Sequence, residues 1–557
     1  MVSVIFIWLY ILFTCYIVGF ACIKIVSGNI KWKVEKETGY LYAGIGVVTI
    51  YAQIFSLFWK VGWLANAVLL LVCLICLLLL RKEFISQLHN FRLTITLQRF
   101  LVSIALFLLF AYGTSRGIIH YDTGLYHAQS IRWIEEYGLV PGLGNLHSRL
   151  AYNSASFCLS ALYSMAFWGG RSFHCCAGFL AFLLALVCTQ GFRRGMLRKP
   201  LLSDFVRVMA IYYLLNIFDE MTSPASDYFM VLLTFFILIK WLDLLERGEQ
   251  SYFPYAMLCV MSVLVVSMKL SGALLLLLTL RPAWQMVRHL PKGRRAREIF
   301  KFLGLGLLTI APFLVRNVIL SGWLVYPFTA IDLFDVDFKI PKGMAEYDAR
   351  EIQVWGRGFS DVTRYAEPAG KWLPEWAAGL DTVNKLFLVL AISGMVLLLL
   401  FIMYAFAKRK KEMAGYLHIG AVMAVCFLFW LFSAPLVRYG CVFLWICPVL
   451  TWGYLYLKIS PHTDRFCVYA VIICLLAFYK AGAFGAELYR QASLEYLVLQ
   501  KDYENYETVP YELHGYTFYY PLHGDQTGYQ DFPASPVKAE DIFRGETIKD
   551  GFRDVIH

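Results

Sequence analysis

Charged residues are scarce in this chain. Only 16% of its 557 residues are Asp, Glu, Lys or Arg, whereas 59% are hydrophobic. The mean hydropathy is +0.60. Soluble domains carry about 25% charged residues and a smaller apolar fraction. The composition therefore excludes an ordinary soluble enzyme and predicts a protein that crosses a membrane many times.

Acidic residues are fewer than basic ones, and the resulting net charge of +11 could by itself indicate a nucleic-acid partner. The Lys and Arg residues, however, gather in short segments between apolar runs, for example 193–199, 294–297 and 408–411. Basic residues retained on the cytoplasmic side of spans explain this pattern. We therefore expect a membrane rather than nucleic acid as the partner.

The sequence has no recognisable disulfide framework and no recognisable nucleotide-binding motif. The polar segments 321–382 and 486–557 contain no cysteine, and the 14 cysteines of the chain lie in or beside apolar runs. Cys73 and Cys76 have metal-like spacing, but they stand in mid-span without His or acidic neighbours and indicate packing. The sequence also lacks GxxxxGK[ST], GxGxxG and HExxH. These absences argue against an ATP-driven pump and a nucleotide-sugar enzyme of Rossmann type.

Long apolar runs dominate what is present. A span needs about 20 apolar residues, and 12 to 14 segments approach that length. The first lacks a basic leader and a cleavage site, so it is expected to be a retained span. The candidates are 2–23, 40–58, 61–80, 100–119, 173–191, 204–218, 225–245, 253–268, 270–281, 300–320, 383–406, 415–434, 439–457 and 467–485.

The positions of the basic segments predict the topology. With these segments in the cytoplasm, the loops 120–172 and 321–382 and the tail 486–557 fall outside. The apolar stretch 154–168 cannot cross without reversing that rule, so we expect a helix lying in the outer interface. The tail is rich in Tyr and Phe and predicts a small ordered cap.

The expected fold class is an all-α polytopic membrane protein with outer-surface juxtamembrane helices and a small C-terminal outer tail. Its expected parts are extra N-terminal spans in 1–99, a transmembrane core in 100–485, and the extracytoplasmic tail 486–557. The expected location is a bacterial cytoplasmic membrane, with the site facing outward.

The first candidate site follows the span 100–119. Asp122 stands among groups that membranes normally exclude, and such groups indicate function. It is the candidate general base for an acceptor hydroxyl, with His120, Tyr126 and His127 shaping the site. The alternative is that Asp122 only caps the helix that follows.

Acidic residues return to the same side in the short turn near 217–227. Asp219, Glu220 and Asp227 could hold a cation, position an acceptor or serve as the base. The alternative is a polar turn that Ser223 and Pro224 break. The histidines of the chain have no metal-like spacing, so no metal ligand is predicted, and participation of a divalent cation stays open.

Three cationic positions stand at outer span ends, against the usual charge bias. Lys269 interrupts an apolar run at a helix break, and Arg316-Asn317 and Arg438-Tyr439 end two other spans. A phosphate held at the outer leaflet would suit them, because Arg binds phosphate bidentately and Lys binds it as a point charge. The alternatives are snorkelling side chains or a hairpin turn at Lys269.

Taken in order, these elements resemble the membrane glycosyltransferases of the GT-C superfamily. The elements, covering about 100–457, are YDTGLYHAQSIRWIEEYG at 121–138, the helix 154–168 with the span 173–194, the turn 219–227, Ser267-Met268-Lys269, Arg316-Asn317 and Arg438-Tyr439. The sequence of residues 122–147 also resembles a family of uncharacterised bacterial multi-span proteins. The usual paired carboxylates are absent, because Thr123 follows Asp122, which argues against metal dependence.

The resemblance implies a transfer reaction at the membrane surface. A sugar on a polyprenyl-phosphate lipid would pass, with inversion, to a glycan or glycolipid acceptor. Asp122 would take the acceptor proton, while Lys269, Arg316 and Arg438 would stabilise the leaving phosphate. The alternatives that stay open are a polysaccharide polymerase, a transporter of lipid-linked glycans and a non-catalytic assembly protein.

Overall fold

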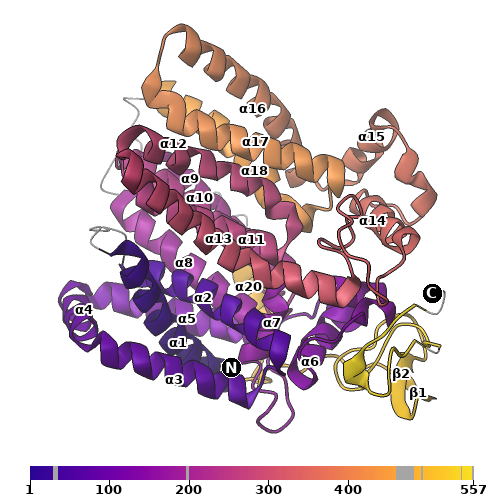
Figure 1. The fold of residues 1–557 in the computed structure, drawn as a ribbon. Coiled ribbons are helices and arrows are strands. Elements are labelled where there is room, and N and C mark those ends of the chain that lie inside the picture. The colour runs from indigo at the N-terminus through magenta and orange to yellow at the C-terminus, as the bar shows by residue number, and fades with distance from the viewer. Residues whose placement is uncertain (29–35, 196–199, 460–481, 491–492, 541, 555–557) are drawn as a thin grey trace.

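The computed structural model describes residues 1–557 except 29–35, 196–199, 460–481, 491–492, 541 and 555–557. Helices dominate the described residues (Figure 1). The helices of the bundle are α1 (Val2–Ser27), α2 (Lys36–Phe58), α3 (Trp63–Leu79), α4 (Arg81–Thr94), α5 (Leu97–Arg116), α8 (Cys176–Gly195), α9 (Leu202–Asn216), α10 (Ser226–Glu246), α11 (Tyr252–Met268), α12 (Leu280–His289), α13 (Lys292–Ser321), α16 (Thr382–Ala407), α17 (Ala414–Ser433) and α18 (Val437–Ile459).

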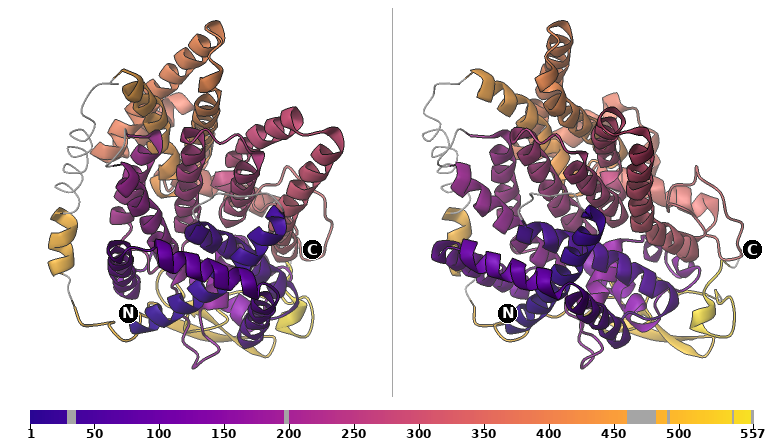
Figure 2. Two further views of the ribbon diagram at one scale, coloured as in Figure 1. Left: turned by 90° about the vertical axis from the view of Figure 1, so that its left-hand side faces the viewer. Right: turned by 60° about the vertical axis from the view of Figure 1, so that its left-hand side comes forward.

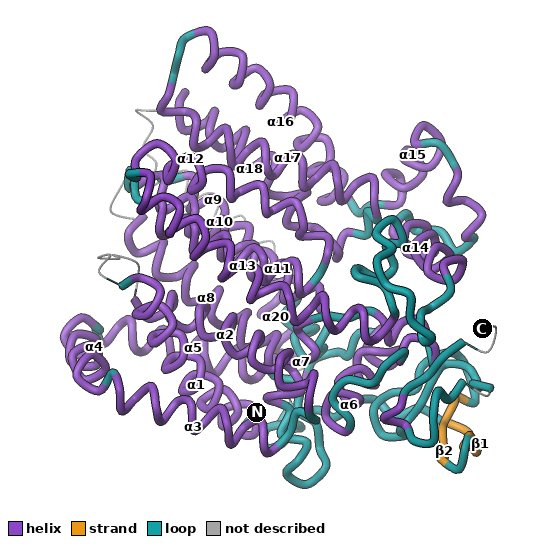
Figure 3. Tube along the Cα trace, in the orientation of Figure 1, coloured by secondary structure: helices purple, strands orange, loops and turns teal. Residues whose placement is uncertain are grey.

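The other described elements lie between or after them. These are η1 (Thr123–His127), α6 (Ala128–Glu136), η2 (Leu143–Asn145), η3 (Ser148–Ala151), α7 (Ala155–Tyr163), η4 (Leu270–Thr279), α14 (Lys342–Gly356), η5 (Val362–Ala366), α15 (Ala369–Gly379), η6 (Lys411–Met413), α20 (Gly482–Arg490), β1 (Thr508–Leu513), β2 (Tyr516–Pro521) and η8 (Ile548–Asp550). Figure 3 shows the loops gathered with α6, α14 and the two strands on one side of the helices. We call this side, formed by 117–175, 322–381 and 493–554, the loop end.

Nine helices of the described residues are long and apolar enough to cross a membrane, or ten if the pair α3 and α4, bent by 85°, is one span. The chain is thus an all-α protein of the multi-span membrane type. The expected count of 12 to 14 is higher because it included α9 and α11, which are shorter, and α8, whose apolar part is Cys176–Thr189. Most of the expected span 467–485 lies outside the described residues.

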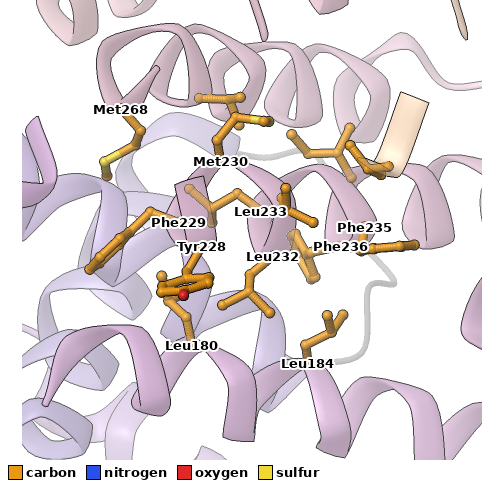
Figure 4. Packing of buried hydrophobic residues seen from close by; sticks show 14 of the residues in the cluster. Leu180, Leu184, Tyr228, Phe229, Met230, Leu232, Leu233, Phe235, Phe236 and Met268 are labelled. Atoms are coloured by element: carbon orange, nitrogen blue, oxygen red, sulfur yellow. The ribbon is translucent and has the colours of Figure 1, made fainter. Parts of the chain in front are cut away.

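Helix α10 is the centre of the bundle. Every residue from Asp227 to Asp243 is buried. Helices α8, α9, α11 and α18 pack around it, and Figure 4 shows Phe229, Leu232 and Phe236 among the side chains that fill this core. A helix that is apolar all round is stable only when it is surrounded, so α10 holds its two ends in fixed positions.

Most of the stretch 154–168 lies inside the protein. Residues 155–163 form the nine-residue helix α7, all of whose residues are buried, and α7 packs against α2 and α6, whereas Phe167 and Trp168 are exposed. Nine residues are too few to cross a membrane. This agrees with the charge pattern, which requires that the stretch does not cross. The expectation of a surface helix was wrong because apolar residues face a protein interior as readily as a lipid.

The tail is ordered and forms part of the loop end. Strands β1 and β2 pair antiparallel, with Thr508 opposite Pro521. Phe518 and Phe552 pack with Trp133 of α6 in a small separate core, and Figure 2 shows the tail in yellow beneath the helices. The predicted ordered cap is therefore present in 508–554.

One buried carboxyl ties the tail to α6. Glu135 accepts hydrogen bonds from Ser172 (2.9 Å) and from Tyr529 of the tail (2.6 Å). Burial raises the pKa of Glu135 to about 7, even though these hydrogen bonds oppose the rise. The buried carboxyl therefore takes up a proton more readily than an exposed one would.

This linkage predicts pH-dependent docking of the tail. Because the pKa of Glu135 is raised, the stabilisation is complete below the ordinary pKa of 4.5. It is lost as the pH rises to about 7. We expect the protection of 500–535 against hydrogen exchange, taken as the exchange rate relative to the intrinsic rate at each pH, to be greater at pH 5 than at pH 8. Glu135→Gln should remove most of this difference, whereas Glu136→Gln, on the exposed neighbour, should keep it. A pH difference unchanged in Glu135→Gln would contradict the assignment.

Candidate functional site

Asp122 stands at the start of an unusual turn. It precedes η1, a five-residue π-helix, and its side chain makes no capping hydrogen bond. Single π turns occur frequently at functional sites. The alternative that Asp122 serves only as a helix cap therefore has no support in the geometry, and its carboxylate is directed elsewhere.

The ion-pair partner of Asp122 is distant from it in the sequence. Arg438 donates from Nη2 to Asp122 Oδ2 at 2.5 Å. Gly440 follows two residues later with non-helical backbone angles, and a Cβ there would lie 2.4 Å from the ring of Trp430. Only glycine fits this close approach, and the break in α18 lets Arg438 reach the carboxylate.

A second ion pair adjoins the first. Lys269, in extended backbone between α11 and η4, forms an ion pair with Asp227 at the start of α10. Arg438 Nε lies 3.7 Å from Asp227 Oδ2, and the Lys269 ammonium lies 3.7 Å from the centroid of the Tyr439 ring. Two cations and two carboxylates from four separate segments thus meet at the loop end.

His120 completes the cluster as a neutral acceptor. Its Nδ1 lies 3.1 Å from the Asp122 amide, which donates to it, and 3.0 Å from Arg438 Nη1. Burial and the Arg438 charge lower the pKa of His120. The ring is therefore uncharged at neutral pH, and it orients the Arg438 guanidinium.

Electrostatics keep Asp122 ionised. Burial alone would raise its pKa, but the charge of Arg438 lowers the pKa below its ordinary value. The side chain is 19% exposed, and that of Arg438 is 28% exposed. The carboxylate is thus partly accessible and paired, so it becomes a stronger base whenever an anion draws Arg438 away.

The other candidates near Asp122 support the turn. His127 is buried, lies 3.2 Å from the Thr123 hydroxyl, and has its pKa lowered to about 3 by burial. Tyr126 packs against His127 and Tyr152. Both side chains fix the π turn rather than titrate near neutral pH.

The acidic turn contributes one carboxylate to the cluster. Asp227 belongs to it, whereas Glu220 accepts a hydrogen bond from Tyr228 at 2.6 Å. The backbone carbonyl of Asp219 accepts from the Ile118 amide at 2.5 Å, so it positions the segment before His120. Among the described residues, no three His, Cys, Asp or Glu side chains are arranged to hold a metal.

Arg316 and Asn317 are used inside the protein. Arg316 is 3% exposed and donates to Ser56 and to Asn153 Oδ1, while Asn317 donates to the Leu324 carbonyl at 3.1 Å. These bonds to neutral oxygens hold α13 against α2 and its own following turn. Both residues therefore have a packing role in this structure, and neither side chain is exposed to a phosphate.

The tail also supports the π turn, which the sequence did not predict. Tyr121 donates to Asp525, and Gln526 donates to the Tyr121 carbonyl at 2.8 Å. The amides of Thr527 and Gly528 both donate to the Gly124 carbonyl. The segment carrying Asp122 is thus held by residues about 400 positions later.

The contacts of Arg149 were also not predicted from the sequence. Arg149 lies 4.4 Å from the centroid of the Trp355 ring, and its Nη2 is 3.3 Å from Glu351. Its charge acts on the pKa of Tyr121, beside Asp122. No sequence signal linked Arg149 to α14.

Together these features define an all-α membrane protein with a charged, partly exposed site at its loop end. The family model described as "Domain of unknown function (DUF8201)" matches residues 1–445. The chain belongs to this family. Searches of the curated proteins and of the solved structures found no match.

Proposed function

We propose that this protein is a membrane glycosyltransferase of the GT-C type. It moves a sugar from a polyprenyl-phosphate-type carrier to a glycan or lipid acceptor at the outer face of the cytoplasmic membrane. The single observation that carries the proposal is the meeting of Asp122, Arg438, Asp227 and Lys269 at one partly exposed point. It combines a base with two phosphate-binding cations.

The proposed reaction is one displacement. The acceptor oxygen attacks the anomeric carbon, its proton passes to Asp122, and the bond from that carbon to the phosphate oxygen breaks with its electron pair going to the phosphate. The sugar is inverted. Charge grows on the leaving phosphate, so cations placed beside it stabilise the transition state more than the ground state.

The ion pairs of the cluster suggest an order of steps, in which the donor binds before the base acts. The cluster is electrically balanced, with Arg438 and Lys269 facing Asp122 and Asp227. A donor phosphate that binds Arg438 replaces Asp122 as its partner. The pKa of Asp122 then rises toward its ordinary range, because the charge that lowers it is shared with the phosphate. Donor binding thereby strengthens the base.

Loop 321–382 and the tail supply the acceptor side. Trp355 is 37% exposed and stacks on Arg149, and Glu351 pairs with the same guanidinium. Aromatic faces beside charged hydrogen-bonding groups suit a carbohydrate, which presents both C–H faces and hydroxyls. This group supports a sugar-bearing acceptor next to Asp122.

Mass spectrometry of cell-surface glycans and lipid-linked intermediates tests the proposal. A strain lacking the gene should lose one sugar from a glycan and accumulate the corresponding lipid-linked monosaccharide. The wild-type gene should restore the glycan, and Asp122→Asn should fail to do so while reaching the membrane at normal levels. Accumulation of a lipid-linked oligosaccharide instead would favour a polymerase or a transporter, and full restoration by Asp122→Asn would contradict a catalytic Asp122.

A further inference from the structure

Helix α4 lies at the end of the bundle opposite to the loop end. It follows the apolar helix α3 with a bend of 85°, and Ile95 and Thr96 alone join it to α5. Helix α3 starts at the loop end, where the Val61 amide donates to the Ile134 carbonyl at 3.0 Å, and α5 returns there. The bend therefore turns α4 across the far ends of two membrane helices, as Figure 1 shows at its left.

Very little protein covers α4. From Arg81 to Leu93, every residue except Phe84 and Gln87 is exposed. Phe84 anchors the helix on Phe20 of α1, with 4.4 Å between the ring centroids. Isolated helices shorter than about 12–15 residues are only marginally stable in water, and α4 has 14 residues. The helix therefore needs a further surface to stabilise it.

One exposed side of α4 carries two apolar residues between two arginines. Arg81, Ile85, Leu88 and Arg92 are spaced by four, three and four positions, which places them on the same side of a helix. Ile85 is 58% exposed, and Leu88 is 62% exposed. Glu83, the one carboxylate of α4, falls on the opposite side. We call the first four residues the basic strip.

The basic strip is not neutralised by the protein. Neither Arg81 nor Arg92 forms an ion pair or a side-chain hydrogen bond with another described residue. Both are exposed, so their charges are available to an anion outside the chain. Helices that lie in a membrane surface combine apolar residues with basic ones in this way, because the long cationic side chains reach the headgroups while the apolar side chains enter the lipid.

The neighbouring helices carry a lipid-facing surface up to both ends of α4. Leu78 and Leu79 at the end of α3 are exposed, as are Leu97 and Leu101 at the start of α5. Exposed apolar side chains of membrane helices are covered by lipid. The membrane surface therefore lies at the level of α4, and the bend of 85° directs the helix along that surface.

We propose that α4 lies in the membrane surface and binds anionic lipid headgroups through Arg81 and Arg92. Ile85 and Leu88 enter the boundary between headgroups and acyl chains, and the two guanidinium groups hold lipid phosphates, which Arg binds bidentately. Basic residues beside a membrane favour a negatively charged leaflet over a zwitterionic one. The inference is independent of the proposed transferase activity, because no residue of the Asp122 cluster takes part.

Hydrogen exchange of α4 in nanodiscs tests the proposal. The full-length protein would be reconstituted in phosphatidylcholine alone, or in equal parts of phosphatidylcholine and phosphatidylglycerol, and compared at one pH. We expect residues 81–94 to exchange at least about tenfold more slowly with phosphatidylglycerol, whereas α14 at the loop end should exchange alike in both. About 1 M salt should remove the difference, because it shortens the Debye length to about 3 Å.

Two variants of the same helix locate the contact. Arg92→Gln removes a cation from the basic strip, whereas Lys82→Gln removes one that lies outside it. Both side chains are exposed, so both variants should fold, which unchanged exchange of α14 would verify. We expect Arg92→Gln to lose most of the effect of phosphatidylglycerol and Lys82→Gln to retain it.

Three results would overturn the proposal. The first is equal exchange of α4 in the two kinds of nanodisc, and the second is an equal loss in Arg92→Gln and Lys82→Gln. The third is protection of α4 that appears without phosphatidylglycerol and grows with protein concentration, which would assign the helix to a contact between copies of the chain.

Discussion

Asp122→Asn is expected to lower the turnover of sugar transfer by on the order of 10²–10⁴-fold, the range that a general base contributes. The amide keeps the size of the carboxylate and can still accept from Arg438, which now donates to Asp122 at 2.5 Å. It cannot take the acceptor proton. Turnover should be measured with the purified protein and lipid extracts that contain the accumulated donor.

The matched control is another Asp–Arg pair on the loop end. Asp337 accepts from Arg544 Nε at 2.7 Å, and its side chain is 51% exposed. Exposed pairs of this kind contribute little to stability, so Asp337→Asn should retain normal turnover. Equal turnover in Asp122→Asn and Asp337→Asn would remove Asp122 from the mechanism.

Arg438→Gln should have the second largest effect. It removes the cation that pairs with Asp122 and lies 3.7 Å from Asp227, and we expect a loss of about 10²–10³ in kcat/KM, as for one stabilising donor of a developing oxyanion. It should also move the acid limb of the pH profile upward. Burial still raises the pKa of Asp122, while the Arg438 charge that lowered it is gone.

Two comparisons separate this role from a structural one. Arg544→Gln, the same change in the surface pair, should leave both turnover and pH profile unchanged. The double variant with Asp122→Asn should be no worse than Asp122→Asn alone, because residues that act as a unit are not additive. Additive losses, or an acid limb that stays in place, would assign Arg438 to folding instead.

Much of the architecture could be predicted from the sequence, because hydrophobic runs and basic segments report directly on membrane helices. The helix break predicted at Lys269 is present. The precise number of spans was harder to predict. Helices such as α9 are short in the bundle, and composition does not show whether an apolar helix faces lipid or protein, as α7 illustrates.

The candidate site was predicted as separate pieces. Asp122, Asp227, Lys269 and Arg438 were each chosen for chemistry, and the structure brings them together. Arg316 had the same sequence signal, an Arg at a span end, yet it bonds neutral oxygens inside the protein. Only tertiary packing separates these cases, because a span end does not reveal which way its side chain turns.

The support from the tail was beyond sequence reasoning for a different reason. The contacts of Tyr121 with Asp525 and Gln526 join segments about 400 residues apart. No local pattern encodes such a pairing. The π turn after Asp122 is also invisible in the sequence, because its five residues fit an ordinary helix equally well.

The most direct test of the central claim is the release of polyprenyl phosphate by the purified protein. Detergent-solubilised wild type would be incubated with lipid-linked donor and acceptor extract, without nucleotide or membrane gradient, and the lipid products followed by mass spectrometry. We predict that polyprenyl monophosphate appears together with glycosylated acceptor, and that neither forms with Asp122→Asn. A donor pool that stays intact with folded wild-type protein would contradict a glycosyltransferase.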